Sequence, residues 1–318
     1  MGGVTDIRDP AAVQATAPKV AARRRTALLA EVVMLSRPAM WVTTLVPFVF
    51  GFVLANKSLL PSNPGEWVDF LVGLVVFGPV SWVSILAVND ANDVDGDIGN
   101  PRRSAHPVAA GRMARRVAER ISLAAAVVAV ALAVTIGWQF VFVTVALLVL
   151  GVVYSAPPLR LKTRPGADVA LNAVAAGLLA ILAGWLTIGS FTGFPWVIAV
   201  QGVLVAAAGY IPTTVADYDA DLASGYTTFA VRLGRRRAHL AGLACWLAAN
   251  VGALVLSWHD VVLPRAMLPV LAVACPILVL AYHLAFARAQ RYGAIKRAFA
   301  VVAALFAIPV GVFLMIYK

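Results

Sequence analysis

The sequence predicts an all-α integral membrane protein with nine transmembrane helices and a cytoplasmic N-terminus. Apolar residues make up 61% of its 318 residues and charged residues only 13%, with a mean hydropathy of +0.87. Soluble domains are typically about 45–50% apolar and about 25% charged, so this composition excludes a soluble domain and a disordered chain. The two cysteines, Cys245 and Cys275, lie in apolar runs and exclude a disulfide scaffold or a cysteine-rich zinc site.

Each predicted helix is an apolar run that can cross a bilayer, which takes about 20 residues. In chain order the runs are 38–56, 67–89, 120–137, 139–154, 167–187, 194–216, 238–258, 264–287 and 295–316. The third and fourth runs nearly merge at Gly137–Gln139, where we expect a tight external turn. Residues 1–28 are polar and lack the apolar stretch and cleavage site of a signal peptide, so we expect a cytoplasmic N-terminal segment.

The positions of lysine and arginine predict the orientation of these helices. With the N-terminus inside, every Lys and Arg falls in an inner segment except Lys57, Arg265 and Lys318. Because cationic loops resist translocation, this asymmetry favours a cytoplasmic N-terminus and an external C-terminus. The formal net charge of +11 is therefore an indication of topology and not of nucleic-acid binding.

Seven of the 15 acidic residues gather in two short clusters, at the inner ends of the second and sixth runs. The clusters are Asp90, Asp93, Asp95 and Asp97, and Asp217, Asp219 and Asp221. If helix continues through the first cluster, Asp90, Asp93 and Asp97 share one face, as Asp217 and Asp221 do on the other helix. Asp95 and Asp219 are then expected to point elsewhere.

Carboxylates packed this closely favour a divalent cation between them. They repel one another, and desolvation near a bilayer favours their protonation, unless a cation keeps them ionised. Magnesium prefers oxygen ligands and completes its coordination with water and substrate phosphates. Two clusters at one membrane depth thus predict a diphosphate held between magnesium ions. The alternative, two solvated acidic helix ends, is less favoured because the pattern recurs four spans later, which also suggests two related four-helix halves with a ninth helix added.

Basic residues between the fourth and fifth runs are candidates for binding the phosphates. In Tyr154–Lys162 a proline pair ends the helix and forces an extended turn. Arg160 and Lys162 alternate with leucines, so both are expected to point one way, Arg as a bidentate fork and Lys as a point charge. The alternative is that they are ordinary positive charges of an inner loop.

Other polar residues give weaker indications. Arg37 precedes the first run, and Arg102 and Arg103 follow the first acidic cluster; these arginines either reach a phosphate or only lie at the interface. The four histidines are scattered without metal-ligand spacing. No nucleophile motif, nucleotide-binding glycine loop or haem signature occurs.

Taken together, the motifs resemble the UbiA superfamily of intramembrane prenyltransferases. Asn89-Asp90-x-x-Asp93-x-x-x-Asp97 is similar to its first aspartate-rich motif, and Asp217-x-x-x-Asp221, followed by Gly225, Thr228 and Val231-Arg232-Leu233-Gly234, is similar to its second. Tyr154-Ser-x-Pro-Pro-x-Arg160-x-Lys162 and Arg37-Pro38-x-x-Trp41 resemble two further family segments. All four follow the family's order between about residues 36 and 237. The chain departs in having Ala220, where many relatives have glycine.

The resemblance implies one transmembrane domain, residues 29–318, built as a helical bundle around a central cavity. Cytoplasmic loops at 93–120 and 217–237 would form a cap over it. The implied magnesium ligands are Asp90, Asp93, Asp97, Asp217 and Asp221. The implied catalytic set is Asp93, Asp97, Asp217, Asp221, Lys162, Arg160 and Tyr154, and Asn89, Arg37 and Arg103 would contact the diphosphate.

The function predicted in this way is transfer of a polyprenyl group from a polyprenyl diphosphate to a hydrophobic acceptor that enters from the bilayer. Magnesium-assisted ionisation to an allylic carbocation would drive it, in the plasma membrane with the site facing the cytoplasm. Lycopene elongases and (bacterio)chlorophyll synthases are the most similar subfamilies. A terpene cyclase of the same superfamily, without an acceptor, is one alternative. A transporter of Mg²⁺ or a phosphorylated lipid is another, since intramembrane carboxylates also occur there. The sequence does not indicate an oligomeric state.

Overall fold

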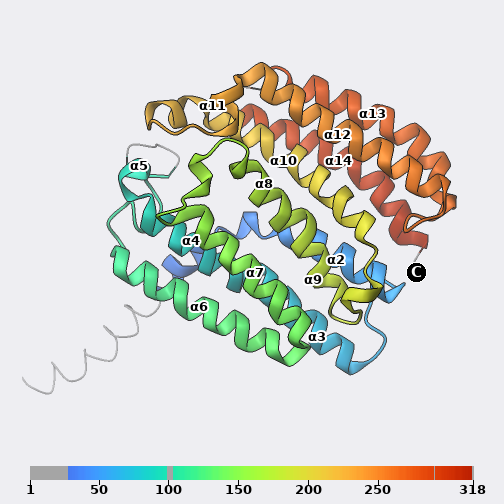
Figure 1. Ribbon diagram of the computed structural model, residues 1–318, viewed down its shortest axis with the longest axis horizontal. Coiled ribbons are helices and arrows are strands. Elements are labelled where there is room, and N and C mark those ends of the chain that lie inside the picture. Colours follow the sequence, from blue (N-terminus) through green and yellow to red (C-terminus); the bar gives the residue numbers. More distant parts are fainter. Residues whose placement is uncertain (1–27, 99–102, 290, 317–318) are drawn as a thin grey trace, which may run out of the picture.

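In a computed structural model of the chain, residues 28–98, 103–289 and 291–316 are described, and every regular element among them is a helix. Figure 1 shows these helices as one bundle. The expected N-terminal segment 1–28 lies almost wholly outside the described residues, as does Arg102, and so does the side chain of Asp95.

The longer elements are, in chain order, α2 (Val42–Asn56), α3 (Pro64–Val75), α4 (Ser81–Asn92), α6 (Arg115–Ile136), α7 (Trp138–Ser155), α8 (Ala167–Val174), α9 (Ala180–Trp185), α10 (Trp196–Ala223), α12 (Arg235–Trp258), α13 (Leu268–Phe286) and α14 (Tyr292–Ile316). Two short helices, α5 (Val94–Ile98) and α11 (Phe229–Leu233), lie in the connections. Figure 1 places α5 and α11 at the same end of the bundle.

The prediction of nine spans is confirmed for the described residues. Eight helices are long and apolar enough to cross a membrane, and a ninth span is formed if the bent pair Leu28–Met40 and Val42–Asn56 counts as one. That pair bends by 61°, whereas the sequence predicted a single run from residue 38. The bend follows Arg37, which has a left-handed backbone conformation with φ 46°.

Two spans contain a π-helical turn. The second span joins α3 to α4 through the turn Val76–Val80, where Gly78 has the non-helical angles φ −97° and ψ −113° and kinks the span just before Pro79. Proline has no N–H for the helical ladder, so the turn widens there. The fifth span joins α8 to α9 through a second π-helical turn, Ala175–Leu179.

Small residues let the helices approach closely, as they commonly do in membranes. A Cβ atom added at Gly184 of α9 would overlap the carbonyl oxygen of Phe48 in α2. Between α6 and α7 only Gly137 is non-helical, with φ 146°, so the tight turn expected there is present. The largest buried cluster, which includes Phe48, Phe77 and Phe140, joins α2, the second span, α7 and α9.

Candidate active site

The second acidic cluster lies on one uninterrupted helix. Because α10 runs on to Ala223, Asp217 and Asp221 stand one turn apart on the same face, as predicted. Asp219 points elsewhere, also as predicted: its side chain is 83% exposed and pairs with Arg235 at 2.6 Å. The chain therefore presents two carboxylates, not three, from this helix toward the bundle end.

Two carboxylates fix the segment that follows α10. Gly225 turns the chain with φ 71°, a conformation that costs glycine little. Thr228 then donates from Oγ1 to Oδ2 of Asp221 at 2.9 Å. The next backbone N–H, that of Phe229, donates to Oδ2 of Asp168 at 2.8 Å. Asp168 is 1% exposed and lies in the first turn of α8, so it links α8 to α11.

The first acidic cluster does not lie on one continuous helix. α4 ends at Asn92, Asp93 has the non-helical angles φ −113° and ψ 8°, and α5 begins at Val94. The condition for a single helical face, a helix that continues through Asp90, Asp93 and Asp97, is therefore not met. Aspartate, asparagine and glycine are weak helix formers whose side chains or flexibility compete with helical backbone hydrogen bonding. The side-chain amide of Asn92, the last residue of α4, donates from Nδ2 to the backbone carbonyl of Val88 at 2.8 Å.

Each buried carboxylate of this cluster has a cationic partner. Arg160 donates from Nη2 to Oδ1 of Asp93 at 2.9 Å, and Lys162 pairs with Oδ2 of the same residue. Arg103 lies 3.3 Å from Asp97 and 3.9 Å from Asp93. Asp93 and Asp97 are 5% and 4% exposed, so these pairs compensate charges that would be costly to bury alone.

The loop that supplies Arg160 and Lys162 differs locally from the expected extended turn. Arg160 has a left-handed backbone with φ 40°, and Leu161–Thr163 form a 3₁₀ turn. Both side chains nevertheless reach the same carboxylate, that of Asp93. Arg160 also donates to the Tyr226 hydroxyl at 3.0 Å, which connects this loop to the segment after α10.

The two acidic clusters line a common pocket. Its lining includes Asp93, Asp97 and Arg103 from one side and Asp217, Asp221 and Tyr226 from the other. Carboxylates far apart in the chain thus meet around one polar space, as the sequence predicted.

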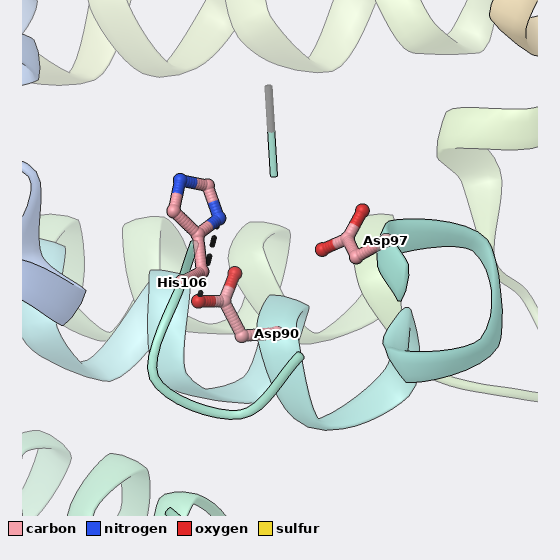
Figure 2. A group of neighbouring side chains, drawn as sticks. All are labelled: Asp90, Asp97 and His106. Atoms are coloured by element: carbon pink, nitrogen blue, oxygen red, sulfur yellow. Dashed lines mark ion pairs between the residues drawn. The ribbon is translucent and has the colours of Figure 1, made fainter. Parts of the chain in front are cut away.

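Asp90 lies beside this pocket and faces a different set of groups. Figure 2 shows the Asp90 carboxylate near the carboxylate of Asp97 and the imidazole of His106. One possible ligand atom from each of these three side chains lies within 4.8 Å of the other two. Arg37 pairs with Oδ1 of Asp90. The other oxygen, Oδ2, is buried and has no hydrogen-bond partner among the described residues. Such an orphaned carboxylate oxygen, with the carboxylate of Asp97 close to it, fits a divalent cation such as magnesium.

Two of the predicted residues make contacts within the bundle. Asn89, expected at the diphosphate, donates from Nδ2 to Oγ of Ser155 at 3.0 Å. Tyr154, expected in catalysis, shares a 2.7 Å hydroxyl contact with Tyr210 of α10. Neither side chain is among those that line the acidic pocket.

Burial disfavours charge throughout this end of the bundle. It raises the pKa of Asp97 above its ordinary value. It lowers the pKa of Lys162, although Asp93 counteracts the shift. Burial, together with the nearby arginines, lowers the pKa of His106 to about 4, so this imidazole is neutral at pH 7.

Three residues at this end of the bundle were not among those expected from the sequence: His106, Asp168 and Tyr226. For His106 no local pattern exists, because its partners are brought to it by the fold. For Asp168 a signal was present, since an acid in the first turn after Pro165 and Gly166 is typical of a helix start.

Comparison with known proteins identifies the family. The sequence model of the UbiA prenyltransferase family matches residues 44–315, most of the chain. The chain belongs to the UbiA prenyltransferase family. The resemblance seen in the sequence motifs is thereby confirmed, and this UbiA chain is an integral membrane protein and a prenyltransferase.

The curated relatives place this UbiA protein near the lycopene elongases. It is 30% identical to lycopene elongase/hydratase of Haloarcula japonica over 226 residues, 70% of this chain and 73% of the relative. It is also 30% identical to lycopene elongase/hydratase of Haloferax volcanii over 247 residues, 74% and 78% of the two chains. Among solved structures, a UbiA homologue from Archaeoglobus fulgidus bound to GPP and Mg²⁺ superposes with a TM-score of 0.72 at 23% identity, covering 89% of this chain and 99% of that one.

Proposed function

We propose that this protein transfers a polyprenyl group from a polyprenyl diphosphate to a lipid-soluble acceptor at the cytoplasmic face of the plasma membrane. The observation that carries the proposal is the common pocket, which places Asp93 and Asp97 opposite Asp217 and Asp221. The excess of lysine and arginine in the predicted inner segments supports the cytoplasmic orientation.

Magnesium would be held by Asp93, Asp97, Asp217 and Asp221, with Asp90 beside them. Bound there, the metal would neutralise negative charge on the diphosphate as its bond to the prenyl carbon breaks. The chain's own contribution is to hold these carboxylates in place before substrate arrives. Thr228 does so for Asp221 through its hydrogen bond, and Arg103 does so for Asp97.

Arg160 and Lys162 are the cations best placed to act on the leaving diphosphate. Both are ion-paired with Asp93, which lines the pocket. A phosphate oxygen can take the place of that carboxylate as their partner, and charge-assisted hydrogen bonds of this kind are strong. We assign them the stabilisation of negative charge on the departing oxygen.

The names of the relatives support a polyene acceptor. The two relatives reported above are lycopene elongase/hydratases, so we propose a long apolar polyene such as lycopene as the acceptor. We also propose that residues 29–318 form a single domain in which the 93–120 and 217–237 segments cover the polar site. The short helices α5 and α11, which lie together at one end of the bundle, belong to these segments.

The decisive experiment uses the full-length protein in lipid nanodiscs with geranylgeranyl diphosphate, Mg²⁺ and lycopene, followed by diphosphate release and product mass. We expect lycopene enlarged by one or two prenyl units. Asp217→Asn should abolish both signals, whereas Asp219→Asn, an exposed carboxylate of the same helix, should leave them unchanged.

Other outcomes would overturn the proposal in distinguishable ways. Diphosphate release with only the hydrocarbon or alcohol of a single prenyl unit would indicate a cyclase. Uptake of Mg²⁺ or a phosphorylated lipid into proteoliposomes, without any diphosphate cleavage, would indicate a transporter.

A further inference from the structure

His106 is placed among carboxylates that come from other parts of the chain. It belongs to the turn region that precedes α6, while Asp90 is in α4 and Asp97 in α5. One ligand atom from each of these side chains lies within 4.8 Å of the others. In Figure 2 the two carboxylates and the imidazole occupy one small region, with the close approach of His106 to Asp90 drawn as a dashed line.

The lone pair of His106 that faces this cluster is on Nδ1. Nη2 of Arg37 lies 3.0 Å from Nδ1, and guanidinium is always a donor and never an acceptor. Nδ1 therefore accepts, and the ring proton of the neutral imidazole is on Nε2. The same Nδ1 is 4.0 Å from Oδ2 of Asp90. The Nδ1 lone pair, which Arg37 occupies in this structure, is the one that an imidazole offers to a metal once such a donor withdraws.

One oxygen of the carboxylate opposite Nδ1, Oδ2 of Asp90, has no hydrogen-bond partner among the described residues. Asp90 is only 2% exposed. A buried acceptor without a partner costs free energy. A cation between Oδ2 and Nδ1 would satisfy both atoms at once.

Arg37 supplies positive charge to the same two residues. Its Nη2 contacts both Asp90 and His106, while its buried Nε has no partner among the described residues. The Arg37 guanidinium thus occupies the position between the two side chains that a bound cation would need. Displaced from here, the guanidinium is free to bind a phosphate.

We propose that Asp90, Asp97 and His106 form a mixed nitrogen–oxygen site for a divalent cation, with His106 as a metal ligand and Arg37 as the exchangeable positive charge. The proposal rests on the proposed function only in treating the first acidic cluster as metal-binding. An imidazole ligand favours transition metals, whereas magnesium prefers oxygen. This protein is therefore expected to bind Mn²⁺ or Co²⁺ more tightly than Mg²⁺.

The test is pulsed electron paramagnetic resonance of the full-length protein loaded with Mn²⁺ in nanodiscs. We expect ¹⁴N modulation from a directly bound imidazole in the wild type. His106→Gln keeps an acceptor for Arg37 but removes the imidazole, so the modulation should disappear and Mn²⁺ affinity should fall by about tenfold or more. Mg²⁺ affinity should fall by less.

A matched control separates the effect of His106 from that of His239 and His283, two histidines that lie next to each other elsewhere in the bundle. His239 and His283 lie 3.2 Å apart at their ring nitrogens, between α12 and α13. The double variant His239→Gln/His283→Gln should keep the ¹⁴N modulation. Stoichiometric Mn²⁺ without nitrogen modulation, or modulation unchanged in His106→Gln, would overturn the metal-ligand assignment.

These readouts do not depend on prenyl transfer. Loss of the nitrogen assignment while the wild type still transfers prenyl groups would remove this inference and leave the proposed function standing. Nitrogen coordination of Mn²⁺ in a protein that cleaves no diphosphate would support this inference and overturn the proposed function.

Discussion

The two acidic clusters meet at one pocket but are built differently. In the first, the helix is interrupted at Asp93, and arginine or lysine side chains pair with its carboxylates. In the second, α10 is continuous through Asp217 and Asp221, and the neutral hydroxyl of Thr228 donates to Asp221. Arg235 pairs with Asp219, the exposed carboxylate of the same helix.

This difference predicts that the two clusters contribute differently to stability and to metal binding. Buried ion pairs hold the first cluster together, and removing one member leaves a charge uncompensated. The first cluster is therefore expected to govern both stability and charge exchange with the substrate. Within the second cluster, Asp221 accepts a hydrogen bond from the neutral hydroxyl of Thr228, so its loss is expected to affect metal binding more than stability.

The largest expected effect is that of Asp93→Asn compared with Asp221→Asn. Both should reduce diphosphate release by about 10²–10³-fold, the usual cost of losing one group that stabilises developing charge. Only Asp93→Asn should also lower the melting temperature, because it leaves Arg160 and Lys162 without their buried partner. Single-turnover diphosphate release and thermal unfolding in detergent measure the two effects. Equal melting temperatures of the two variants would contradict the stabilising role assigned to the ion pairs of Asp93.

A second prediction concerns Lys162. Lys162→Met should reduce the rate constant for diphosphate release by about 10²-fold, since one charge-assisted contact to the leaving group is lost. Arg164→Met, an exposed position of the same loop, is the matched control and should be neutral. If the rate is unchanged in Lys162→Met while substrate affinity falls, Lys162 acts in binding only.

The pH dependence sharpens the role of Lys162. Burial lowers the pKa of Lys162 below the ordinary 10.5, so its cation is present at low pH and is lost as pH rises through the lowered value. We therefore expect activity to fall on the alkaline side at a pH below 10.5. Arginine stays protonated in this range, so Lys162→Arg should move that fall to higher pH. An alkaline limb that is identical in the two proteins would assign it to another group.

The smallest predicted effect is that of Thr228→Val. It removes the hydrogen bond to Asp221 without changing charge, and should weaken Mg²⁺ binding by about tenfold with little change in melting temperature. Thr227→Val, at the exposed neighbouring position, is the control. Calorimetric titration with Mg²⁺ measures the difference, and a larger loss of stability than of metal affinity would give Thr228 a purely structural role.

The spans were predictable because hydropathy is a local property of the chain. The run 238–258 corresponds to Arg235–Trp258, and most other predicted ends are equally close. Besides the first span, one discrepancy is instructive: the sixth run ends at residue 216 by hydropathy, but α10 continues to Ala223. Backbone hydrogen bonding carries a helix past the point where its side chains become polar, and these last two turns hold Asp217 and Asp221.

The site was predictable in its composition and only partly in its contacts. Spacing along α10 correctly placed Asp217 and Asp221 on one face, because that helix is continuous. Spacing could not place Asp93 in the same way, because the helix ends before it. The partners of its carboxylate are 67 and 69 residues away in the chain, a separation at which no helical or strand periodicity gives information.

By itself, the sequence determined the nine apolar spans, the positions of the carboxylates and cations at their ends, and the family motifs. Each of these depends on residues close together in the chain, where side-chain polarity and helical period act directly. Only the tertiary structure decided that Arg37 would lie between Asp90 and His106, and that Arg160 and Lys162 would share Asp93. Packing of distant helices brings those groups together, and burial makes their pairing necessary because an isolated charge there would be too costly.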